Sequence, residues 1–157
     1  MSHDKLTPPP IVPREKLDFG LDGDIPKYWL DNDAFKTRFF DALSTLFPVG
    51  EKFFITCVRD FKDRITDPKM RQDIKDFTRQ EGQHGILHTQ YNNRLKTQGV
   101  NVDAILEGQD KRLFGIIRKH FSREFTLGIT AASEHITAIM ADCFVERPEI
   151  FANADER

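Results

Sequence analysis

Carboxylate and imidazole side chains occupy core positions of a helix predicted over residues 68–98. Glu81 and His84 are three residues apart, and His88 follows four residues later. Spacings of three and four residues place side chains on one face of an α-helix. Burying a carboxylate and two imidazoles in such a face is unfavourable unless they are paired, and a metal ion would pair with them. The rest of the stripe is apolar or aromatic: Met70, Ile74, Phe77, Tyr91 and Leu95.

Two further predicted helices each carry one carboxylate in an otherwise apolar stripe. Glu51 is the charged member of a stripe over 47–65. Glu134 is the charged member of a stripe over 127–145. Single carboxylates on facing helices beside a Glu-x-x-His pair form the ligand pattern of ferritin-like metal bundles. Such oxygen and imidazole donors suit a divalent metal, for which we expect iron, with manganese or zinc as alternatives. The expected metal ligands are Glu51, Glu81, His84, His88, Glu134 and His135.

These residues also have structural interpretations. Glu51 could be a charge favoured by the dipole in the first turn of a helix that begins at Pro48. His88 could form a hydrogen bond within the core, and His135 points about 100° away from Glu134, where a supporting role fits better than ligation. A buried polar network in a non-catalytic helical module is therefore the alternative to a metal site. The occurrence of carboxylates on three separate stripes favours the metal.

The elements that position these residues are all predicted to be helices. Asp33 and Asp67 are the expected N-caps of two of them, and Pro48 suits the first turn of a third. Gly99 and Pro148 mark helix ends. Residues 100–108 are predicted to be a connector, and no strand-like alternation is present. The predicted helices span 33–47, 48–65, 68–98, 109–121 and 122–146.

Composition divides the chain into an arm and one helical domain. Prolines and glycines crowd residues 1–25, which we interpret as an extended N-terminal arm, whereas 26–157 is the expected metal-binding domain. The fold class is all-α, a ferritin-like helical bundle.

Charge and hydropathy exclude several classes of partner. The net charge of -2 leaves no basic footprint for nucleic acid. The chain has no run of about 18 apolar residues, so no membrane span is predicted. Cys57 and Cys143 lie in apolar helical patterns, where buried reduced thiols of a cytoplasmic protein are expected. The fourteen phenylalanines are compatible with an apolar small-molecule substrate.

Several segments in order carry a family resemblance: 47–54 (FPVGEKFF), 59–60 (RD), 77–84 (FTRQEGQH), His88 with Asn92, and 130–138 (TAASEHITA). Over roughly residues 24–150 the chain resembles the bacterial family of predicted metal-dependent hydrolases. The family name implies a metal-dependent hydrolase, with Glu81 binding metal and His88 or a free carboxylate as general base. The ferritin-like ligand pattern implies di-iron oxidase or oxygenase chemistry instead. Both interpretations are kept.

Members of that family continue into a further helix with a second set of Glu and His, whereas this chain ends at Arg157. A ferritin-like di-metal site takes about six ligands from four helices. Three explanations remain open: the chain is a C-terminally short form, a second protomer supplies the missing ligands, or the site holds one metal. A short bundle would leave an apolar face uncovered, which favours a homodimer.

Overall fold

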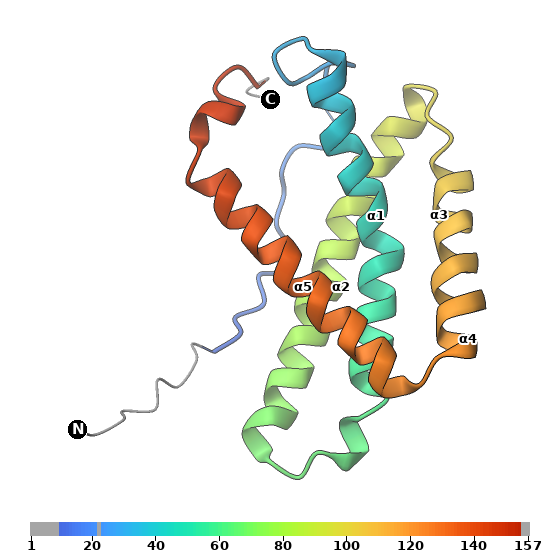
Figure 1. The fold of residues 1–157 in the computed structure, drawn as a ribbon. Helices are drawn as coiled ribbons and strands as arrows, with labels where there is room; N and C mark the ends of the chain where they lie inside the picture. Colours follow the sequence, from blue (N-terminus) through green and yellow to red (C-terminus); the bar gives the residue numbers. More distant parts are fainter. Residues whose placement is uncertain (1–9, 22, 155–157) are drawn as a thin grey trace.

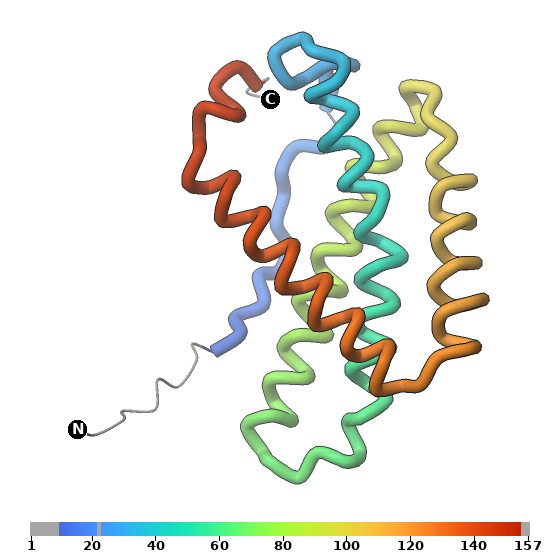
Figure 2. The backbone as a smooth tube through the Cα atoms, in the orientation of Figure 1, coloured from blue at the N-terminus to red at the C-terminus, as the bar shows by residue number. Residues whose placement is uncertain are grey.

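A computed structural model describes residues 10–21 and 23–154. Within them the long elements are helices that pack as a bundle, which confirms the all-α prediction. Helices α1 and α2 run antiparallel, α3 lies beside α1, and α5 crosses both at an angle (Figure 1 and Figure 2). The elements are α1 (Ala34–Arg59), η1 (Lys62–Arg64), α2 (Pro68–Thr97), α3 (Val102–Asp110), the π-helix η2 (Lys111–Ile117), α4 (Arg118–His120), α5 (Arg123–Val145) and η3 (Pro148–Phe151).

Short polar side chains begin the three long helices. The Asp33 carboxylate accepts hydrogen bonds from two amides of α1, and the Asp67 carboxylate accepts one from α2. Ser122 does the same for α5. Each cap satisfies amides that have no partner within their own helix. At the other end of α2, Gly99 has φ +87°, the left-handed conformation that often ends a helix. The predicted bounds of α2 and α5 are confirmed to within one or two residues.

Pro48 lies inside α1, so the prediction of two helices meeting there is wrong. A proline nitrogen has no proton, which leaves the carbonyl of the residue four positions earlier, Ser44, without its helical partner. The side-chain amide of Asn92 on α2 donates to this carbonyl at 3.1 Å. Asn92 is buried, at 2% exposure. A contact from another helix therefore keeps α1 continuous.

Residues 102–108 of the predicted connector are helical, so that prediction is also wrong for all but its first two residues. Asn101 accepts a hydrogen bond from the Ala104 amide and begins α3, and Val102 is fully buried. The helical path continues through η2 and α4 as far as His120. Asparagine is a favoured N-cap residue, so Asn101 could have predicted the start of this helix. The apolar pattern of the segment was too weak to indicate a helix by itself.

The chain before α1 has no helix or strand at 10–21 and 23–25, and it lies along α2. Glu15 pairs with Arg79, and Gln98 donates to the Ile25 carbonyl at 3.2 Å. Of the two free cysteines, Cys57 is buried as expected, whereas Cys143 is exposed on α5. None of the described helices combines the length and apolar character that crossing a bilayer requires.

Candidate metal centre

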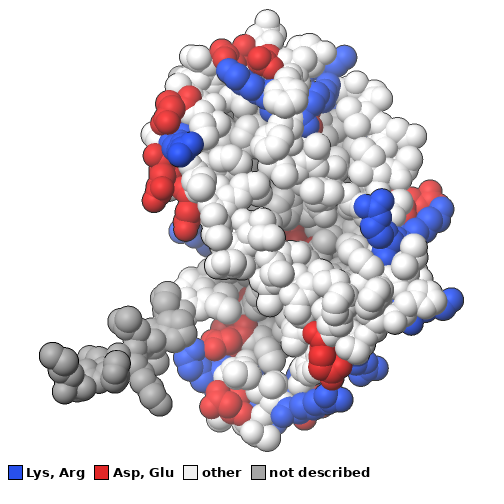
Figure 3. Space-filling view, viewed as in Figure 1, with Lys and Arg blue, Asp and Glu red and all other residues white. Residues whose placement is uncertain are grey.

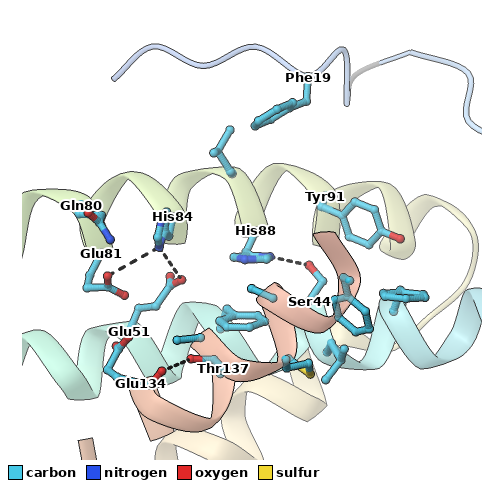
Figure 4. Close-up of a pocket in the computed structure, with 18 of the residues that line it drawn as sticks. Phe19, Ser44, Glu51, Gln80, Glu81, His84, His88, Tyr91, Glu134 and Thr137 are labelled. Carbon is cyan, nitrogen blue, oxygen red and sulfur yellow. Dashed lines mark hydrogen bonds and ion pairs between the residues drawn. The ribbon is translucent and has the colours of Figure 1, made fainter. Parts of the chain in front are cut away.

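Three side chains from two helices form a cluster of possible metal ligands. Glu51 comes from the middle of α1, and Glu81 and His84 from successive turns of α2. One ligand atom from each lies within 4.8 Å of the others. His84 Nδ1 is 3.7 Å from Glu81 Oε1 and 3.9 Å from Glu51 Oε1, and the three groups face one another (Figure 4). These distances are too long for hydrogen bonds, and the contacts are ion pairs when His84 is protonated.

Glu51 is buried without a hydrogen-bonding partner. It is 2% exposed, and both of its carboxylate oxygens lack a hydrogen bond among the described residues. Since α1 begins at Ala34, Glu51 is far from the helix start, and the dipole explanation of its charge is wrong. A buried carboxylate without partners is costly, and a divalent cation coordinated by such oxygens removes that cost. The residues therefore fit a metal ion.

Glu51 and Glu134 hold protons unusually tightly. Burial first, and then the charge of Glu81, raise the pKa of Glu51 from 4.5 to about 8. The same two causes raise the pKa of Glu134 to about 7. The nearby carboxylates, Glu81 above all, raise the pKa of His84. These shifts are what a cation site produces when negative groups are gathered in a partly dry pocket.

Gly85 allows Glu51 to approach the backbone of α2. A Cβ built at Gly85 would lie 3.1 Å from Glu51 Oε2, closer than ordinary packing permits. Gly85 was not among the predicted site residues, although an isolated glycine inside a helical pattern indicates close packing or function. Gly82, one turn earlier on α2, has open space at the same position and so has no such role.

Glu134 and His135 are neighbours in sequence but differ in their surroundings on α5. Glu134 lines the same cavity as the cluster, and its Oε1 is buried without a hydrogen bond among the described residues. It lies outside the group of three ligand atoms. His135 is exposed and does not line the cavity. The structure therefore brings Glu134, but not His135, to the site.

His88 lies further along α2 in a more apolar environment. Its Nδ1 is 3.0 Å from Ser44 Oγ, and its ring stacks on Phe47 with 4.4 Å between centroids. Burial first, and then the charge of His84, lower the pKa of His88 to about 4. The imidazole is therefore neutral at pH 7, and the hydrogen bond is the one expected of a core histidine. Ser44, which the sequence analysis did not single out, orients it.

A cavity of about 720 Å³ extends from the cluster between α1, α2 and α5. Figure 3 shows the hollow on this face, with white walls and a small acidic patch inside it. Glu51, Glu81, His84, His88 and Glu134 all line it. Its other walls are mainly aromatic and aliphatic, and the aromatic side chains include Trp29, Phe40, Phe47, Phe54, Phe144 and Phe151.

Comparison with known proteins gives one finding. Neither the curated proteins nor the solved structures contain a match to this chain. The family model described as predicted metal-dependent hydrolase matches residues 13–157, which include the whole cluster and every residue of the cavity. This chain belongs to the family of predicted metal-dependent hydrolases.

Proposed function

We propose that this protein is a metal-dependent hydrolase that binds one divalent ion, preferably iron, through Glu51, Glu81 and His84. The observation that carries the proposal is Glu51, whose two buried and unpartnered oxygens lie beside the other two ligands. Manganese and zinc are the alternative ions, since all three accept carboxylate and imidazole ligands.

The chain's own residues supply binding, orientation and proton transfer. A divalent ion contributes Lewis acidity, polarising a carbonyl and making water a better nucleophile at neutral pH. Glu134 lines the cavity with a free oxygen and is the first candidate for the general base. His88 is the second, because it lines the same cavity and Ser44 holds its ring in place. The aromatic walls limit the access of water.

Di-iron oxidase or oxygenase chemistry is the second candidate function. The observation in its favour is Glu134, a third carboxylate on the cavity wall besides Glu51 and Glu81. A two-metal bundle site takes about six ligands, and the described cluster supplies three. A homodimer is part of this proposal, because apolar side chains of α5 are exposed, among them Ile136, Ile139 and Val145. A non-catalytic helical module is the third candidate.

The first experiment measures metal content by plasma mass spectrometry, together with the mass of the protein in solution. We expect about one ion per chain, lost in Glu51→Gln and His84→Ala and kept in the control His135→Ala. Chelation should abolish hydrolysis of a panel of p-nitrophenyl esters, and the ion should restore it. Oxygen consumption without hydrolysis would instead support the di-iron candidate. Absence of metal after anaerobic reconstitution with iron would refute both the hydrolase and the di-iron proposal. The non-catalytic helical module would then remain.

A further inference from the structure

We propose that the cavity binds the apolar body of a neutral ester or amide, with the scissile carbonyl at the Glu51, Glu81 and His84 end. The reaction rests on the proposed function, whereas the binding of the apolar body does not. In the reaction the oxygen of water bonds to the carbonyl carbon and the bond to the leaving oxygen or nitrogen breaks. The leaving group takes a proton from the water, so that an acid and an alcohol or amine are formed.

The cavity has a polar end and an apolar end. Along α2 its lining runs from Glu81 through His88 to Tyr91, and along α1 from Glu51 through Phe47 to Phe40. With a rise of about 1.5 Å per residue, each row is roughly 15 Å long. Figure 4 shows the carboxylates gathered at one end of these rows and Tyr91 towards the other. A substrate therefore lies lengthwise between α1 and α2.

Aromatic rings line the apolar end. Phe40 is at the centre of this group, with its ring centroid 5.2 Å from that of Phe144 and 5.1 Å from that of Phe151. Trp29 packs on Phe40 at 6.0 Å. These walls have no charged group to bind a second polar end. A cavity of this length fits an extended chain of about ten carbons, given carbon–carbon bonds of about 1.5 Å in a zigzag.

The charges at the polar end disfavour an anionic substrate. Three carboxylates, Glu51, Glu81 and Glu134, line the cavity, and no Lys or Arg lines it among the described residues. One divalent ion leaves this set with an excess of negative charge when the carboxylates are ionised. A carboxylate, sulfate or phosphate on the substrate would be repelled, whereas an ester or amide carbonyl would not.

Trp29 allows binding to be measured without catalysis. It is the single tryptophan of the chain, it lines the cavity, and its indole donates to the Tyr91 hydroxyl at 2.8 Å. We expect N-methyldecanamide to change its fluorescence saturably, with a Kd at least tenfold below that of decyl sulfate. N-methylbutanamide should bind at least 100-fold more weakly than the decanamide, because six buried methylenes are lost. Equal binding of decyl sulfate, or of the short amide, would overturn the inference.

A cavity-filling variant with a matched control completes the test. Ala141 and Ala132 are both exposed on α5, but Ala141 lines the cavity and Ala132 does not. Ala141→Phe should weaken decanamide binding at least tenfold and lower the ratio of kcat/KM for p-nitrophenyl decanoate to that for the acetate. Metal content should stay unchanged, and Ala132→Phe should change neither binding nor the ratio. Unchanged binding in Ala141→Phe would contradict the assignment.

The two proposals fail in different ways. Decanamide binding without metal-dependent hydrolysis would refute the proposed function and uphold the apolar binding site. Metal-dependent hydrolysis with equal kcat/KM for the acetate and the decanoate would uphold the function and refute the substrate class.

Discussion

Replacing Glu51 by glutamine should change how the stability of the metal-free protein depends on pH. The pKa of Glu51 is about 8 in the folded protein, against 4.5 as its ordinary value. Between these values the unfolded chain loses a proton that the folded chain keeps, so the free energy of unfolding falls as pH rises. Each pKa unit is worth about 1.4 kcal/mol, so the loss amounts to about 3 to 5 kcal/mol by pH 9. Below pH 4.5 the group is protonated in both states and the loss disappears.

Glutamine keeps the shape of the side chain and cannot ionise. Its buried amide costs about 1 to 3 kcal/mol if unpaired, but that cost is the same at every pH. In Glu51→Gln the fall in unfolding free energy between pH 5 and pH 9 should therefore be smaller by about 3 kcal/mol.

Urea unfolding followed by circular dichroism, with a chelator present, measures the two slopes. Glu107→Gln is the control, since the Glu107 side chain is 66% exposed. This substitution should change the free energy of unfolding by the same amount at pH 5 and pH 9. Parallel pH dependence of Glu51→Gln and the wild type would refute the reasoning. It would mean that the Glu51 carboxylate has a stabilising partner in the folded protein.

Two further pairs of substitutions test the contacts between α1 and α2. Asn92→Ala should destabilise the protein by about 1 to 3 kcal/mol in urea unfolding, because the Ser44 carbonyl loses its donor. The cost should shrink when Pro48→Ala restores a backbone amide, and an equal cost in both backgrounds would contradict the capping role. Gly85→Ala should lower metal affinity about tenfold in calorimetric titration, because its Cβ displaces the Glu51 carboxylate. Gly82→Ala should leave metal affinity unchanged, and an equal loss in both variants would show that the effect is not local.

Much of the fold and part of the centre follow from local signals. Helix starts and stops can be predicted from the sequence because each such residue acts on amides or carbonyls within a few residues of itself. The examples here are the starts at Asp33, Asp67 and Ser122 and the stop at Gly99. The same is true of Glu81 and His84, whose three-residue spacing places them on one face of α2 wherever that helix packs. These features needed no knowledge of the partner helices.

The errors arose where a distant residue overrides a local preference. Pro48 is a helix breaker by its chemistry, and α1 passes through it because Asn92, 48 positions beyond Ser44, supplies the missing donor. Glu51 then changes from a helix-start charge to a buried mid-helix carboxylate. Neither outcome is visible in the pattern of α1 alone.

The sequence by itself determined which residue types stand on the apolar faces of the helices, because helical periodicity is a local property. Only the tertiary structure decided that Glu51 meets Glu81 and His84, that Glu134 lines the same cavity and that His135 does not. It also decided that Gly85 makes room for Glu51 and that aromatic rings continue the cavity away from the charges. The physical reason is that convergence depends on the rotation, crossing angle and separation of whole helices. Many weak contacts set these quantities together, and no short stretch of sequence encodes them.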